Sequence, residues 1–239
     1  MDQFHPIQRN ATTGELFLPL LDHPSIILTP PRRTDRFAMV PIMNDERVYP
    51  WLISPPFPYT LENADWWLDR AIPATEALIA ELSSVDTSTT LKTVNGCPVT
   101  QIRELLPDGS DVFIGAIDFT LARHPFELEG TGRTPAQIDA GPQRDPANPD
   151  VWTVGDYLAP SHHGRGIMSD AFRTLLTLWG IPRMGIRKMA VNALKGNGGS
   201  VRVFEKYGFR LREYKAGEEP VVNARGFMKP VDVLDWSLE

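Results

Sequence analysis

The sequence predicts an α+β domain whose second half contains a βαβα unit. Short β-type runs bounded by turn residues, and helical stripes of apolar residues, both support this class. After Val151 the strand and helix patterns alternate, as they do where helices cover a sheet. The chain has 239 residues, of which 42% are apolar, so it is long enough to bury one sizeable core.

Composition excludes several classes of function. Lys and Arg number 24 against 30 Asp and Glu, and the net charge of -6 argues against a nucleic-acid partner. No run reaches the roughly 18 apolar residues of a membrane span, so no membrane partner is expected. Residues 1–6 lack the basic start of a secretory signal, and Cys97 is the single cysteine. These features predict a cytoplasmic protein.

The first third of the chain mixes short elements with proline-rich loops. Residues 1–24 show no sustained period and are interpreted as an N-terminal arm. Ser25–Thr29 is a β-type run that ends before two prolines, and Asn44–Leu52 opens with the capping and acidic residues typical of a helix start. Thr60 begins a longer helix that runs to about Ser84, either unbroken or interrupted at Pro73.

The middle of the chain is strand-like. Residues 97–105 and 112–121 flank the turn Pro107–Ser110 and predict an antiparallel hairpin. Residues 124–150 combine five prolines with little periodicity, so they form a long loop or an insertion. The elements expected afterwards are strands at 151–158, 186–193 and 209–214, helices at 164–180 and 200–207, and a strand-rich segment at 227–238.

One motif lies where the strand 151–158 ends and the next helix begins. It reads Pro160-Ser161-His162-His163-Gly164-Arg165-Gly166. Glycines at a helix N-terminus let backbone N–H groups approach an anion, so this turn is a candidate phosphate or pyrophosphate site; a tight structural turn is the alternative. The spacing matches neither the Rossmann glycine fingerprint nor a Walker loop.

A second motif follows about thirty residues later. Asn197 and Ser200 bracket the start of a short helix, and Glu205-Lys206-Tyr207-Gly208-Phe209 ends it at a C-capping glycine. In this order and spacing the two motifs resemble the GNAT superfamily of acyl-CoA-dependent N-acetyltransferases, in particular its ribosomal-protein N-terminal acetyltransferase (RimJ/RimL) branch. The segments Pro58-Tyr59-Thr60 and Ala64-Asp65-Trp66-Trp67 are similar to the same branch.

The resemblance covers residues 25–239, with 1–24 as an arm and 124–150 as an insertion. It implies a GNAT fold, in which a mixed, mostly antiparallel twisted sheet has splayed central strands and flanking helices. The co-substrate implied is acetyl-CoA, with no metal. The implied coenzyme contacts are Tyr157, Leu158, Ala159, His163, Gly164, Arg165, Gly166, Ile167, Asn192, Asn197, Ser200 and Phe204.

Acyl transfer to an amine needs a base and an oxyanion donor. Candidate bases are Asp156, on an otherwise apolar strand face, and Asp118, on the neighbouring strand, where burial would raise either pKa. Alternatively, a bulge at Gly155 turns Asp156 outwards, or both acids merely bond backbone groups. Glu127 and His124 are weaker candidates within the long loop. The implied oxyanion donor is a backbone N–H near Tyr157 or Leu158.

A further residue would reprotonate the CoA thiolate. Many family members have a tyrosine where this chain has Phe204. The branch that the chain resembles places a serine near the CoA sulfur, which implies Ser200 as the acid, and Tyr207 is the second choice. Thiolates leave readily, so no acid is strictly required.

Two other groups of residues have competing interpretations. His162 and His163 lack partners at metal-ligand spacing, which argues against a metal site. Trp51, Trp66 and Trp67 either line an amine pocket or belong to the core.

The sequence thus predicts an N-acetyltransferase that moves an acetyl group from acetyl-CoA to a primary amine by direct attack in a ternary complex. The acceptor is a small-molecule amine or a peptide, and the protein is a monomer or a homodimer. Ser161, which stands where the family has Gln or Arg, and Phe204 favour a rival, a non-catalytic acyl-CoA-binding module. A scaffold domain without coenzyme affinity is the third possibility.

Overall fold

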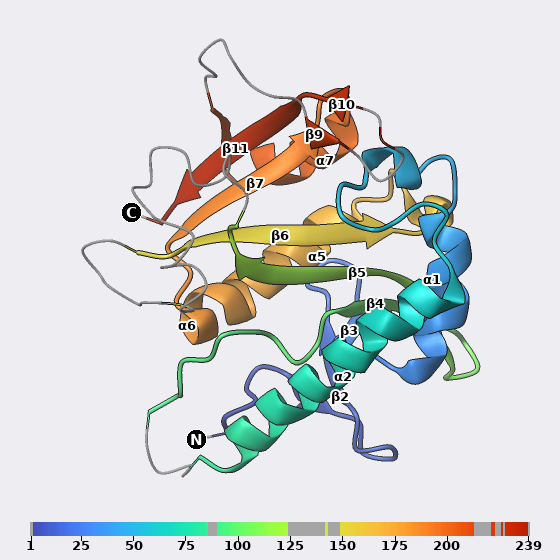
Figure 1. Ribbon diagram of the computed structural model, residues 1–239. Coiled ribbons are helices and arrows are strands. Elements are labelled where there is room, and N and C mark those ends of the chain that lie inside the picture. Colours follow the sequence, from blue (N-terminus) through green and yellow to red (C-terminus); the bar gives the residue numbers. More distant parts are fainter. Residues whose placement is uncertain are drawn as a thin grey trace.

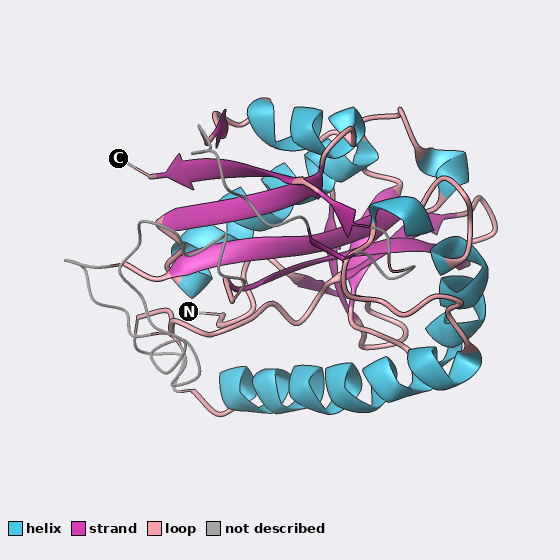
Figure 2. Cartoon of the chain, turned by 45° about the horizontal axis from the view of Figure 1, so that its top comes forward, coloured by secondary structure: helices cyan, strands magenta, loops and turns pink. Residues whose placement is uncertain are grey.

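The computed structural model describes residues 2–85, 90–123, 142, 149–212, 221–222, 226 and 228–238. Within them, nine strands form one sheet in the order β1-β2-β3-β4-β5-β6-β7-β11-β8, and β9 and β10 form a separate pair. Helices cover both faces of the sheet, so the molecule has three layers (Figure 2). No helix in these residues combines the length and apolar character needed to cross a bilayer.

Residues 1–24, expected as an arm, contribute two strands to the sheet. They contain β1 (Gln8–Arg9) and β2 (Leu16–Pro19), and β2 pairs with β3 (Ile26–Thr29). Leu16, Leu18 and Leu20 are buried. These residues therefore pack at one edge of the sheet. Strands of this length are too short to show an alternating pattern in the sequence, so the sequence did not predict them.

A helix lies where the sequence indicated none. Helix α1 (Arg36–Met43) ends at Asn44, so the expectation that Asn44 starts a helix is wrong. Its side-chain amide donates to the carbonyl oxygens of Val40 and Tyr59, at 2.9 and 2.7 Å, and its Oδ1 accepts from the Tyr59 amide. Residues after Asn44 form turns and a short 3-10 helix, η2 (Tyr49–Trp51).

Helix α2 (Leu61–Ser83) is continuous through Pro73. Its N-terminus has the capping arrangement that the sequence indicated, since Thr60 and Asn63 exchange backbone-to-side-chain hydrogen bonds. Helices α1 and α2 pack together, and α1 packs on β5. They lie in front of the sheet in Figure 1, and α5 lies behind it.

The predicted hairpin is present as β4 (Gln101–Leu105) and β5 (Asp111–Leu121), which pair antiparallel. Strand β5 pairs antiparallel with β6 (Val151–Leu158) in an unbroken register. The chain then forms η3 (Pro160–His162), α5 (Ile167–Leu175), the π-helical turn η4 (Leu176–Gly180) and α6 (Ile181–Met184).

Strands β6 and β7 (Lys188–Leu194) form the one parallel pair of the described sheet. They are paired only where Val151 faces Lys188 and Trp152 faces Met189, although both strands continue for several residues. They start together and diverge (Figure 1). The predicted splayed strands are therefore confirmed.

The remaining elements close the far side of the opening. Helix α7 (Gly198–Glu205) packs on β7 and on β11 (Val231–Ser237), and β11 also pairs with β8 (Arg210–Leu211). Strands β9 (Val221–Val222) and β10 (Met228–Lys229) form the small second sheet.

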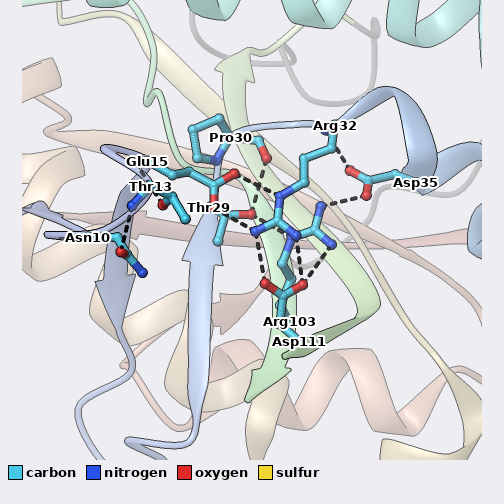
Figure 3. Close-up of polar contacts among 9 residues, drawn as sticks. All are labelled: Asn10, Thr13, Glu15, Thr29, Pro30, Arg32, Asp35, Arg103 and Asp111. Carbon is cyan, nitrogen blue, oxygen red and sulfur yellow. Dashed lines mark hydrogen bonds and ion pairs between the residues drawn. The ribbon is translucent and has the colours of Figure 1, made fainter. Parts of the chain in front are cut away.

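A network of charges joins the N-terminal strands to the middle of the sheet (Figure 3). The Arg32 guanidinium binds the carboxylates of Glu15 and Asp111, and Arg103 binds Asp111 and the buried Asp35. Arg103 and Asp35 are 3% and 2% exposed, so each charge needs the other. The network fixes the segment between β3 and α1 against β4 and β5.

Candidate active site

A cavity of about 1300 Å³ opens where β6 and β7 part. One end is bounded by the 162–169 segment and α7, and the other by α1, α2 and the residues between them. Both ends meet at β6, of which residues 153–158 line the cavity. A single space therefore joins the two predicted halves of the site.

The loop before α5 has the backbone geometry that an anion site needs. Gly164 and Gly166 have φ of 72° and 80°, in the left-handed region that favours glycine, and both line the cavity. Helix α5 begins directly after Gly166, so its positive end faces the same space. No acceptor among the described residues takes the amide N–H of either glycine.

Hydrogen bonds of its side chains stabilise this loop, and His162 and His163 also line the cavity. The His163 Nε2–H donates to the carbonyl oxygen of Leu158 at 2.8 Å, so the loop is tied to the end of β6. His162 lies between the Ser161 hydroxyl and Glu104, and Arg165 pairs with the same Glu104 at 3.3 Å. Arg165 thus does not line the cavity.

The histidines have no metal-site surroundings within the residues that are described. No three His, Cys, Asp or Glu side chains there are grouped as a metal ion would require. Their hydrogen bonds instead hold the loop.

Asp118 and Asp156 both line the cavity, but they face opposite sides of the sheet. In the β5–β6 ladder Asp118 lies opposite Gly155, and Asp156 lies opposite Ile117. Directly opposed residues share a face. Phe119, on the face of Ile117 and Asp156, packs on Phe172 of α5, so Asp156 points toward α5 and Asp118 toward α1 and α2. The ladder runs unbroken past Gly155, so the bulge considered for this position is absent.

Burial changes the ionisation of both acids. It raises the pKa of Asp118 to about 7, against a smaller opposing effect of the hydrogen bond from the Phe119 amide. It raises the pKa of Asp156 to about 6. Both side chains remain partly exposed to the cavity, so each could exchange a proton with a group bound there.

The second motif is divided between the cavity and the core. Asn197 caps α7 by accepting from the Ser200 amide at 3.2 Å, and both residues line the cavity together with Asn192. Phe204 is 1% exposed and packs in the core against Phe172, with ring centroids 5.2 Å apart. Phe204 therefore does not line the cavity.

Other predicted residues are placed as follows. Tyr157, Leu158 and Ile167 line the cavity, and Ala159 is buried outside it. Tyr207 packs on Phe172 with centroids 5.7 Å apart and is also outside the cavity, so Ser200 is the better placed of the two candidate acids. His124 and Glu127 lie outside the described residues.

The tryptophans line the cavity, and Trp51 and Trp67 also pack against the core. Trp51, Trp66 and Trp67 line its α1–α2 end and are all at least partly exposed. The other apolar residues there include Met39, Met43 and Tyr59. This end is thus a largely apolar compartment with Asp118 at the sheet.

Sequence reasoning missed several polar residues of the cavity. Arg202 and Lys206, four residues apart, line its α7 end, a spacing that puts both on one side of a helical turn. Gln101 lies in the row of the sheet that also holds Ala116 and Tyr157. The Gln101 Oε1 and the Tyr157 hydroxyl make no hydrogen bond to the described residues.

Comparisons with known proteins agree with this geometry. Residues 25–210 match the family described as "Acetyltransferase (GNAT) domain". No curated protein sequence matches the chain. The solved structure of the ribosomal-protein-S5-alanine acetyltransferase from Vibrio fischeri superposes with a TM-score of 0.55 at 14% identity, covering 89% of this chain and 93% of that one.

Two further solved structures are similar. A GNAT-family acetyltransferase from Bacillus anthracis has a TM-score of 0.56 at 13% identity, covering 92% of this chain and 98% of its own. A microcin C7 self-immunity acetyltransferase, in complex with acetyl-CoA and AMP, has a TM-score of 0.57 at 12% identity, covering 90% and 93%. At these identities the likeness establishes the fold alone.

Proposed function

The chain belongs to the GNAT acetyltransferase family, and from this premise we propose that it transfers the acetyl group of acetyl-CoA to a primary amine. The observation that carries the proposal is the single cavity between β6 and β7, which joins the glycine loop to Asp118. It gives the two substrates one shared space, as direct attack in a ternary complex requires.

The coenzyme would occupy the end formed by the glycine loop and α7. The amide N–H groups of Gly164 and Gly166 and the N-terminus of α5 suit a diphosphate, and Arg202 and Lys206 add positive charge. Beyond Trp152, the edge of β6 that faces β7 is not paired with it, so its backbone groups could bind the pantetheine arm. Acetyl-CoA supplies the acetyl group as a thioester.

Asp118 is the proposed base. Its carboxyl faces the α1–α2 compartment, and a pKa raised to about 7 by burial suits proton removal near neutral pH. The amine nitrogen would lose its proton to Asp118 and bond to the acetyl carbon as the carbon–sulfur bond breaks. The Ser200 hydroxyl would then pass a proton to the sulfur and regain one from solvent, to which Asp118 releases its own. A backbone N–H near Tyr157 or Leu158 would stabilise the oxyanion.

The acceptor is proposed to be a primary amine with an apolar body and no neighbouring carboxylate. The α1–α2 compartment is lined by Trp51, Tyr59 and Trp67, which suit an apolar body. Asp118 would repel a carboxylate on the acceptor. Arg47, which also lines it, is already bound by Asp45 at 2.8 Å. A small amine and a protein N-terminus with a large apolar residue both fit this description.

The proposal is tested by following CoA thiol release with a matched set of amines. We expect 2-phenylethylamine and phenylalaninamide to be acetylated with a higher kcat/KM than phenylalanine, which adds a carboxylate, or spermidine, which adds charge. Coenzyme binding without thiol release from any amine would instead support the non-catalytic acyl-CoA-binding module.

A further inference from the structure

Residues 21–23 form hydrogen bonds with α5, although they precede residues 25–210, which match the acetyltransferase family. The Leu21 amide donates to Thr174 Oγ1 at 3.2 Å, and the Asp22 amide donates to Asp170 Oδ2 at 2.7 Å. Arg173 Nη2 pairs with the Asp22 carboxylate at 2.7 Å. The turn between β2 and β3 is therefore bound to the helix whose N-terminus faces the cavity.

His23 connects this turn to the glycine loop itself. Its Nε2 lies 3.1 Å from the carbonyl oxygen of Arg165, and its Nδ1 lies 2.9 Å from Asp170 Oδ2. A carbonyl oxygen only accepts hydrogen bonds, and so does an ionised carboxylate. The Nε2–H therefore donates to the Arg165 carbonyl oxygen, and Nδ1 pairs with the Asp170 carboxylate.

Asp170 is ionised in this arrangement. Burial alone would raise its pKa, but the hydrogen bonds from His23, the Asp22 amide and Arg173 together lower it. An unpaired carboxylate in the first turn of α5 would repel a diphosphate bound at the helix N-terminus. The hydrogen bonds that Asp170 receives from His23, the Asp22 amide and Arg173 offset that repulsion.

The hydrogen bond to Arg165 has a geometric consequence on the other side of the peptide. In a trans peptide the carbonyl of one residue and the N–H of the next point in opposite directions. His23 holds the Arg165 carbonyl from outside, so the Gly166 N–H points away from His23. Gly166 lines the cavity and its amide has no acceptor among the described residues.

We propose that His23 is a positioning residue for the coenzyme diphosphate: it fixes the Arg165–Gly166 peptide with the N–H turned to the cavity and binds the Asp170 carboxylate beneath it. The proposal rests on the proposed function, because it assumes that the glycine loop binds the diphosphate. It assigns to the N-terminal segment a part in coenzyme binding.

The test compares two acetyl donors: acetyl-CoA, which has the diphosphate, and S-acetyl-pantetheine, which lacks it. In His23→Gln we expect the calorimetric Kd for CoA and the KM for acetyl-CoA to rise about tenfold, the effect of losing one charge-assisted hydrogen bond. The kcat should stay within about twofold, since no group that touches the reacting atoms has changed. Kinetics with S-acetyl-pantetheine, which has no diphosphate, should be unchanged.

His5→Gln is the matched control, because it makes the same exchange at an exposed position of the same segment. Thermal unfolding and turnover of S-acetyl-pantetheine report whether each variant is folded. A second variant, His23→Leu, removes both hydrogen bonds and should weaken CoA binding further. Nitrogen NMR of the wild-type imidazole gives a readout without substitution, and we expect Nε2 to carry the hydrogen that is donated to the Arg165 carbonyl.

Two results would overturn the inference. One is unchanged CoA affinity in folded His23 variants. The other is an equal loss of activity with acetyl-CoA and with S-acetyl-pantetheine, which would indicate general distortion of the site. Failure of the wild-type protein to bind CoA would be a different result, since it would overturn the proposed function and the inference with it.

Discussion

Asp118 lies directly opposite Gly155 in the β5–β6 ladder, so no β6 side chain lies directly across from the carboxyl. A Cβ at Gly155 would meet no heavy atom within 4 Å. The glycine therefore leaves open space beside the proposed base, on the face where the apolar compartment lies. An amine could reach Asp118 through this space.

Filling that space should block the reaction without unfolding the protein. Gly155 does not have a positive φ, so Gly155→Val adds a side chain without backbone strain. We expect the Tm to change little, CoA affinity to be kept, and the KM for the amine to rise steeply. An unchanged amine KM in the folded variant would show that the acceptor does not approach Asp118 from this side.

Replacing the two acids separately should distinguish their roles. Asp118→Asn keeps the shape of the side chain but removes the base, and we expect kcat to fall by about 10²- to 10⁴-fold. Asp156→Asn makes the same exchange on the opposite face of the sheet and should cost much less. Steady-state kinetics measures kcat for both variants, and a larger loss of kcat in Asp156→Asn would reverse the assignment of the base.

The rate should depend on pH through the ionisation of Asp118. The carboxyl acts as a base only when deprotonated, and its pKa is raised to about 7, so kcat/KM should rise with pH through that region. Ionisation of the amine affects the wild type and Asp118→Asn equally. An inflection of the pH profile that is present in the wild type and absent in Asp118→Asn therefore belongs to Asp118. Identical profiles for the two proteins would exclude this role.

Much of the fold could be predicted because its signals are local. The hairpin of β4 and β5, strand β6 and the capped start of α2 follow from alternation and from capping residues near in sequence. Helix α1 was missed because Asn44 followed by two acids resembles a helix start, while in the structure Asn44 ends a helix. An N-cap and a C-cap use similar residues.

The site was predictable only in its local parts. Gly164 and Gly166 are recognisable from their place between a strand and a helix. The opposite orientation of Asp118 and Asp156 depends on the strand register, which is a property of pairing. The contact of His23 with Arg165 spans 142 residues of sequence, and no pattern near His23 indicates it.

Removing the buried cation of the charge network should destabilise the whole protein. Arg103→Met leaves Asp35 buried without its partner, and we expect the free energy of unfolding to fall by about 3–5 kcal/mol. Urea unfolding measures it. Arg47→Met, which breaks an exposed pair with Asp45, is the control and should change stability little. Equal effects of the two substitutions would contradict a structural role for the network.

The glycine loop is the feature on which coenzyme binding depends. Gly164 and Gly166 adopt positive φ, so bulky side chains there would disturb the backbone and cover the amide N–H groups. We expect a folded variant with both glycines replaced by valine to lose affinity for CoA. Circular dichroism and thermal unfolding establish that the variant remains folded.

Isothermal titration of the wild-type protein with CoA tests the central claim most directly. The account predicts saturable binding of one CoA per chain, much weaker binding of pantetheine, which lacks the diphosphate, and no binding by the double valine variant. A folded wild-type protein that takes up no CoA, or a valine variant that binds it as tightly as the wild type, would contradict the claim.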